Sequence, residues 1–154
     1  MRSLPHFALA VVAALIIGCS SEPEKKPAPA PTKQLLELKI TSAIKRTIAV
    51  EKDGAISDVT TNAAGAVQRS AGKLKPDELK TLTEMAASVE WAKIPREGFR
   101  TANGKPVEDG REYELTYYGV SPARTVHSMD GAAEVASFTK LRDTLELHGN
   151  KIGR

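Results

Sequence analysis

The sequence has little cysteine, few aromatic side chains and no long apolar segment. One of its 154 residues is cysteine, Cys19, and 5% are aromatic. A single cysteine excludes a disulfide within the chain and a zinc site built from several thiolates. The apolar run Phe7–Ile17 has eleven residues, whereas a membrane-spanning helix needs about 20. We therefore expect neither a disulfide-stabilised scaffold nor a transmembrane helix.

No charge of one sign is concentrated in a block. The 22 Lys and Arg are interleaved with 19 Asp and Glu, and the formal net charge is +3. Nucleic-acid-binding proteins usually gather positive charge on one face, because phosphate contacts are a local electrostatic sum. We therefore expect no nucleic-acid partner. The remaining composition, 41% hydrophobic and 27% charged, is typical of one globular domain.

The N-terminal segment predicts export. Arg2 precedes the short apolar run, which is the pattern of a signal peptide. The run ends in Ile16-Ile17-Gly18-Cys19, which resembles the lipobox of bacterial lipoproteins, with a branched residue three places before the cysteine and a small residue directly before it. The resemblance implies a signal peptide over residues 1–18, cleavage after Gly18 and a lipid on the Cys19 sulfur. An ordinary cleaved signal followed by a chance cysteine is the alternative.

Residues 19–34 are predicted to be the lipidated cysteine and an extended spacer. They contain four prolines and no large apolar residue before the domain begins, so the segment cannot form a core and reaches roughly 45 Å in polyproline II geometry. A proline-rich recognition motif is the alternative. Two or three acyl chains give durable membrane binding, at about 0.8 kcal/mol per buried CH₂. By analogy with lipoprotein sorting, Ser20 after the cysteine favours the outer membrane of a bacterium with two membranes.

Residues 35–154 are predicted to form a small α+β domain. An antiparallel sheet of two hairpins is expected to pack against two amphipathic helices in the order ββ-α-ββ-α. Asp53-Gly54 lies between two alternating runs, which indicates a hairpin turn. Residues 63–73 are expected to be a loop or a frayed strand. Helices are expected from Pro76 toward Ile94 and from Val135 to a stop at Gly149.

No pattern of a catalytic, cofactor or metal site is present. His127 lies on an expected strand, and His148, in the last helical turn, is interpreted as a cation favourable at a helix C-terminus. The two histidines have no metal-ligand spacing, and no serine lies in a Gly-x-Ser-x-Gly turn. An acidic stretch is interpreted as a solvated loop that enters an edge strand with its charges facing water, rather than as a pair of catalytic carboxylates: Glu108, Asp109, Glu112 and Glu114. We expect a domain that is not an enzyme and holds no cofactor.

Two aromatic residues are the candidates for partner binding. Trp91 follows the first helix and Phe99 lies in the next loop, and tryptophan is enriched at binding hot spots. The alternative for Trp91 is that it closes the edge of the core. The expected function is thus a lipid-anchored binding module in the cell envelope, with a structural accessory of an envelope complex as an alternative.

The order of elements also resembles the emfourin-type inhibitors of thermolysin-like metallopeptidases. The resemblance lies in an opening hairpin, a helix entered by Leu-x-Pro-Asp-Glu-Leu at residues 74–79, and Asp-Gly-Arg-Glu-Tyr-Glu-Leu at residues 109–115 before a second hairpin and a closing helix. It covers most of residues 44–148. It implies peptidase inhibition as an alternative function, with a peptidase as the partner, and assigns no inhibitory residue.

Overall fold

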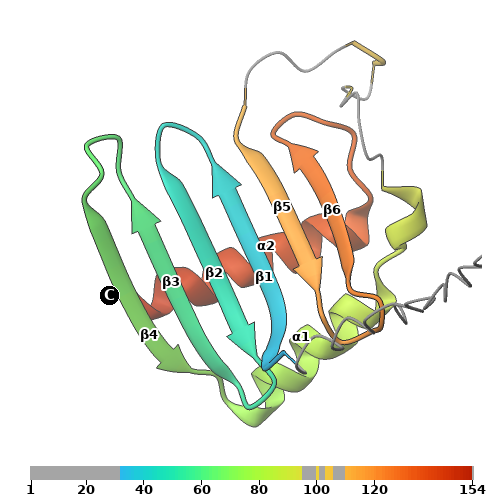
Figure 1. The fold of residues 1–154 in the computed structure, drawn as a ribbon. Helices are drawn as coiled ribbons and strands as arrows, with labels where there is room; N and C mark the ends of the chain where they lie inside the picture. The colour runs from blue at the N-terminus through green and yellow to red at the C-terminus, as the bar shows by residue number, and fades with distance from the viewer. Residues whose placement is uncertain (1–31, 95–99, 101–102, 106–109, 154) are drawn as a thin grey trace, which may run out of the picture. The chain divides into compact units, whose positions relative to one another are not determined.

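The computed structural model describes residues 32–94, 100, 103–105 and 110–153. Their elements follow the order ββββ-α-ββ-α, with a short 3₁₀ turn, η1, after the first helix (Figure 1). The elements in chain order are β1 (Gln34–Thr41), β2 (Lys45–Glu51), β3 (Ala55–Thr61), β4 (Val67–Lys73), α1 (Pro76–Ser88), η1 (Trp91–Lys93), β5 (Glu112–Tyr117), β6 (Arg124–Met129) and α2 (Ala136–Ile152). The expected α+β class is confirmed.

The six strands form one antiparallel sheet in the order β4-β3-β2-β1-β5-β6. The predicted sheet of two hairpins in the order ββ-α-ββ-α is wrong, because β1 and β4 add a strand at each end of the first hairpin. β1 lies between β2 and β5 and so joins the first four strands to the last two. The segment 63–73, expected to be a loop or a frayed strand, contains the regular strand β4, paired along its whole length with β3.

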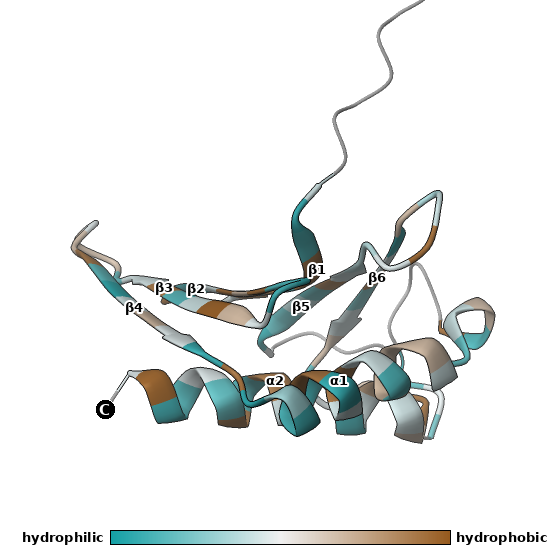
Figure 2. Ribbon diagram, turned by 90° about the horizontal axis from the view of Figure 1, so that it is seen from below, coloured by the Kyte–Doolittle hydropathy of each residue, from teal (hydrophilic) through white to brown (hydrophobic). Residues whose placement is uncertain are grey.

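The helices lie on one face of the sheet (Figure 2). Alternate residues of the central strands point toward them, as the two-residue period of a strand requires. Leu36, Leu38 and Ile40 of β1 are buried. So are their cross-strand neighbours Val50 and Ile48 on β2 and Tyr117, Leu115 and Tyr113 on β5. The residues between them, Glu37 and Lys39, lie on the opposite face of β1, which points away from the helices.

The first helix begins at the predicted residue but ends before the predicted Ile94. Pro76 occupies its first turn, and the Glu78 carboxylate accepts a hydrogen bond from the backbone N–H of Lys75 at 2.9 Å, which satisfies a helix-start donor. Leu82 and Ala86 face the core. The helix ends at Ser88, and the chain then forms η1, so Trp91 belongs to a separate turn rather than to an extended α1.

The second helix is longer than predicted. Phe138, Leu141 and Leu145 form the expected buried stripe, but Gly149 does not stop the helix, which continues to Ile152. Gly149 is buried, and a Cβ built there would lie 2.8 Å from Ile48 Cδ1 on β2. The residue therefore permits close approach of the helix to the sheet.

The predicted turn at Asp53-Gly54 is present between β2 and β3. Gly54 has a φ of 89°, which only glycine adopts without strain. The Asp53 carboxylate accepts a hydrogen bond from the backbone N–H of Ala55 at 2.9 Å. The turn and its side-chain bond together fix the register of the two strands.

Candidate functional site

Trp91, one of the two candidate binding residues, lies at the margin of the core. Its side chain is 7% exposed, and the indole N–H donates to the carbonyl of Ala86 at 3.0 Å. The indole stacks on Tyr117 of β5, with ring centroids 6.0 Å apart and planes inclined by 7°. The other candidate, Phe99, lies outside the described residues, as do Cys19, the lipobox residues Ile16, Ile17 and Gly18, and Ser20.

A groove runs between η1 and the edge strand β6. Its lining residues are Trp91, Ala92, Ala123, Arg124, Thr125, Val126 and His127. Trp91 and the buried Val126 supply an apolar wall, whereas Arg124 and His127 supply the charged or protonatable groups. The groove thus combines an aromatic edge, the cationic Arg124, the imidazole of His127 and five successive residues of one chain segment.

The open face of the sheet beside this groove carries an exposed ion network. Lys39 Nζ lies 2.7 Å from Glu114 Oε1 and 3.4 Å from Glu37 Oε2. The hydrogen bond to Glu114 is the main cause that raises the pKa of Lys39. His127 Nδ1 lies 3.9 Å from Glu114 Oε2. The carboxylate of Glu114 is therefore held by cations.

The other residues of the predicted acidic stretch do not form a carboxylate pair with Glu114 in the described part of the chain. Glu112 is exposed on β5 opposite Met129, and Glu108 and Asp109 lie outside the described residues. The exposure of Glu112 agrees with the sequence-based interpretation, but the expected edge strand is wrong, because β5 is paired with β1 on one side and β6 on the other.

His148 is buried between the helices rather than exposed at a helix end. It is 7% exposed, and its Nδ1 lies 4.0 Å from Glu78 Oε1 of α1. Burial lowers the pKa of His148, Glu78 opposes that shift, and Lys151 adds to it. The interpretation of His148 as a favourable cation is wrong, because desolvation disfavours the charged form.

A polar cluster joins β5, β6 and the start of α2, and sequence reasoning missed it. Tyr113 donates its hydroxyl proton to Asp130 at 2.6 Å, and Arg111 Nε donates to the other oxygen of that carboxylate at 2.9 Å. Burial alone would raise the pKa of Asp130, but these hydrogen bonds outweigh it and lower the pKa. The Arg142 guanidinium lies 4.5 Å from the centroid of the Tyr113 ring.

Glu134 extends the same cluster. Both of its carboxylate oxygens accept hydrogen bonds from Arg142 Nη1, at 2.7 and 2.8 Å, and it also accepts from the hydroxyls of Ser128 and Thr139. The side chains of Glu134 and Arg142 are each 12% exposed. The contacts of Glu134 and Arg142 join the start of α2 to β5 and β6. The cluster therefore holds α2 against the sheet, and we call it the clamp.

A polar recess lies beneath β3 and β4 at the end of α2. Its centre is the ion pair of Arg46 Nη2 and Asp58 Oδ2, 2.6 Å apart, and the same nitrogen donates to Asn150 at 2.8 Å. Both Asp58 oxygens are bonded by Arg46. The ion pair fills the place where the core would otherwise need apolar side chains.

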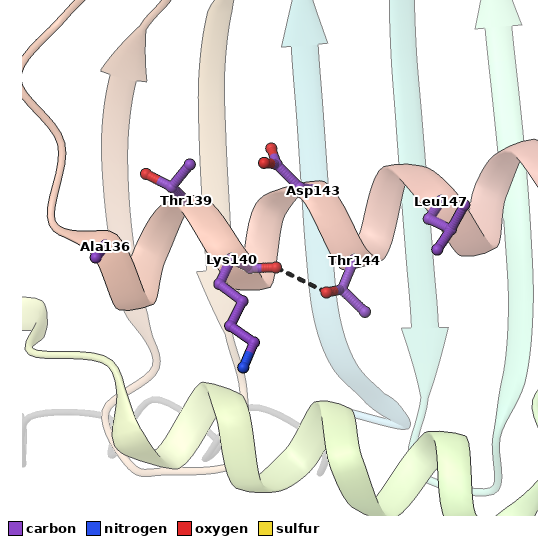
Figure 3. Close-up of a pocket in the computed structure, with 6 residues that line it drawn as sticks. All are labelled: Ala136, Thr139, Lys140, Asp143, Thr144 and Leu147. Carbon is purple, nitrogen blue, oxygen red and sulfur yellow. Dashed lines mark hydrogen bonds between the residues drawn. The ribbon is translucent and has the colours of Figure 1, made fainter.

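A shallow pocket lies along one stripe of α2 (Figure 3). The residues that line it are Ala136, Thr139, Lys140, Asp143, Thr144 and Leu147. Leu147 is 54% exposed, and the Thr144 hydroxyl donates to the Lys140 carbonyl at 2.7 Å. Its mixed chemistry suggests no single ligand class.

The described residues contain no cluster of three or more His, Cys, Asp or Glu that could hold a metal ion. Among the same residues, no helix is long and apolar enough to cross a membrane. No protein-family model matches the chain, and no curated protein matches it.

Proposed function

We propose that this chain is an exported bacterial lipoprotein that holds a small, non-catalytic binding domain on a membrane surface. The observation that carries the proposal is the sequence Ile16-Ile17-Gly18-Cys19, which places the only cysteine of the chain at the end of a signal-like apolar run. Lipid on Cys19 anchors the protein, and Ser20 directs it to the outer membrane of a bacterium with two membranes.

The described domain supports a binding role rather than catalysis. Two carboxylates with little exposure are each paired with an arginine: Asp58 with Arg46, and Glu134 with Arg142. A catalytic acid or base needs a reacting atom within hydrogen-bond reach, and these carboxylates already bond to protein donors. The groove beside β6, in contrast, presents apolar and cationic groups at the surface.

The anchor is tested by a Cys19→Ser variant of the full chain expressed in a bacterium. We expect the parent protein in the membrane fraction with an intact mass raised by acyl chains, and the variant released from that fraction. Ser20→Ala is the matched control, since it makes a small change next to the cysteine and leaves the thiol in place. Equal membrane retention of parent and Cys19→Ser, or an unmodified Cys19 thiol, would refute the lipoprotein assignment.

The binding role is tested by affinity purification of the anchored chain after cross-linking in cells. We expect a defined protein partner that is retained in the Ser20→Ala control. The assay for the peptidase-inhibitor alternative is direct: the purified chain is titrated against a thermolysin-like peptidase. Stoichiometric inhibition would replace the general binding role by that specific one, and turnover of any substrate by the chain would contradict the non-catalytic assignment.

A further inference from the structure

The strand β6 forms one edge of the sheet, and some of its backbone groups have no partner among the residues that the structure describes. The backbone N–H of Asp130 donates to the carbonyl of Arg111 at 2.9 Å, just beyond the β5–β6 ladder. Hydrogen-bonded and non-bonded pairs alternate in an antiparallel ladder, so Val126 of β6 bonds to β5. Thr125 and His127 consequently direct their N–H and C=O groups away from β5, toward the free edge.

Nothing in the described part of the chain hydrogen-bonds to the outward backbone groups of Thr125 and His127. An edge with unpaired N–H and C=O groups is a template for an additional strand. Peptide-binding domains that use this mode obtain affinity from the main-chain bonds and specificity from pockets that receive alternate side chains. The edge of β6 therefore needs a neighbouring pocket to qualify as such a site.

The groove between η1 and β6 meets this requirement. It runs along residues 123–127, so a strand added to β6 would lie beside it over the same length. Arg124 and Val126 belong to the helix-facing side of the strand, which is also the side of Tyr117 and Leu115. Alternate side chains of an added strand would enter the groove on that side, against Trp91.

The charge of the groove selects among peptides. Arg124 is exposed and makes no ion pair with a described residue, and none of the lining residues carries a carboxylate. An acidic side chain opposite Arg124 would gain a cationic partner, and an apolar side chain opposite Val126 would cover the groove wall. Because Arg124 and Val126 are two residues apart on one strand, their ligands are also two residues apart.

We propose that the edge of β6 binds an extended segment of a partner protein as a seventh strand, with an acidic and an apolar side chain two residues apart. This inference rests on the proposed function, since it names the site and the ligand class of the same binding domain. The opposite edge, β4, has outward backbone groups as well, but the recess near it lies beneath the sheet and is polar. β4 is therefore the control edge.

The probe is a random heptapeptide library displayed on phage and selected against the full chain, expressed with its own N-terminal segment and purified in detergent. Binding of the selected peptides is measured by the fluorescence of Trp91, the only tryptophan of the chain. We expect the selected peptides to share an acidic and an apolar residue two positions apart and to contain no proline at the positions that pair.

Thr125→Pro removes an outward N–H and no backbone bond to β5, and we expect it to weaken binding of the selected peptides about tenfold. It also removes the 3.0 Å hydrogen bond between the Thr125 and Thr116 hydroxyls, so Thr125→Val, which loses only the hydroxyl, should bind the peptides like the parent. Arg69→Pro is the matched control, because Arg69 holds the equivalent outward position on β4; we expect its binding within twofold of the parent. Arg124→Glu tests the charge separately, with loss of acidic peptides. Thermal unfolding of each variant identifies any that fails to fold.

Selected peptides whose binding is insensitive to both Thr125→Pro and Arg124→Glu would refute the site, as would a selection that yields no binder. An equal loss in Arg69→Pro and Thr125→Pro would also refute it. These outcomes are distinct from failure of the proposed function: a cellular partner that still binds the Thr125→Pro variant preserves the binding domain and removes only the edge site.

Discussion

Replacement of Gly149 by alanine tests the packing of α2 against the sheet. The change adds one methyl group at a helical position, and helix propensity alone would stabilise the domain by about 1 kcal/mol. The new Cβ, however, would lie 2.8 Å from Ile48 Cδ1 and 2.8 Å from Arg46 Nη2. Neither atom moves freely, because Ile48 is fully buried and the Arg46 guanidinium is held by Asp58 at 2.6 Å.

Overpacking of a dense core costs about 1–3 kcal/mol, which exceeds the propensity gain. With a steric cost near the middle of that range, we expect Gly149→Ala to lower the free energy of unfolding by about 1 kcal/mol. For a domain of this size, that corresponds to a melting temperature lower by roughly 3–6 °C. Thermal unfolding followed by circular dichroism, with urea unfolding beside it, measures both quantities.

Two companion variants determine the cause. Gly153→Ala is the matched control, because a Cβ there would meet its nearest atoms at 3.7 and 3.8 Å, which is ordinary contact; we expect no loss of stability. Ile48→Val removes the Cδ1 atom, so the double variant with Gly149→Ala should lose less than the sum of the two single changes. A Gly149→Ala protein as stable as the parent, or strictly additive losses in the double variant, would refute the packing argument.

Three further changes test other contacts. Glu134→Gln removes the negative charge beside the Arg142 guanidinium, which still pairs with Asp143, and should cost about 1–2 kcal/mol in urea unfolding. A loss below about 0.5 kcal/mol, the scale of an exposed pair, would argue against the clamp. Trp91→Phe removes the hydrogen bond to the Ala86 carbonyl and should cost about 1–2 kcal/mol, with an unchanged melting temperature as the contrary result. Burial lowers the pKa of His148, so on acidification the unfolded state takes up the proton first, and the free energy of unfolding should fall as the pH drops below about 6.5. In His148→Gln this free energy should depend less on pH between about pH 8 and 5. Equal pH slopes in the parent and the variant would exclude His148 as the source.

The amphipathic elements of the fold could be predicted because their apolar residues recur with a clear period. Phe138, Leu141 and Leu145 repeat at helical spacing and face the core as expected. β4 could not be predicted in the same way, since its helix-facing residues are Gln68, Ser70 and Gly72. An edge strand of this kind is held by its ladder with β3 rather than by apolar burial, so its sequence carries no two-residue apolar pattern.

β1 was missed for a different reason. Its register shifts between Gln34 and Leu36, and both Leu35 and Leu36 are buried. Two adjacent buried leucines at the start of the strand obscure its alternation, and they directly follow the proline-rich segment. From Leu36 to Ile40, however, apolar and charged residues alternate with the two-residue period of a strand. β1 could therefore have been predicted from these residues.

The candidate site depends on contacts between distant parts of the chain. Trp91 could be selected from its residue type, but the groove requires residues 91–92 to lie beside residues 123–127, which no local pattern indicates. The polar clamp has the same origin: Glu134 and Arg142 are close in sequence, whereas Ser128 reaches them from β6. The buried position of His148 likewise depends on α1, which supplies Glu78.

The central place of β1 has a mechanical consequence. The described chain enters the sheet at Gln34, and β1 is flanked by β2 on one side and β5 on the other. Tension on the N-terminal segment therefore pulls along a strand held by two ladders, whose bonds must shear together. If the first strand lay at an edge, the same pull would meet a single ladder and could open it bond by bond.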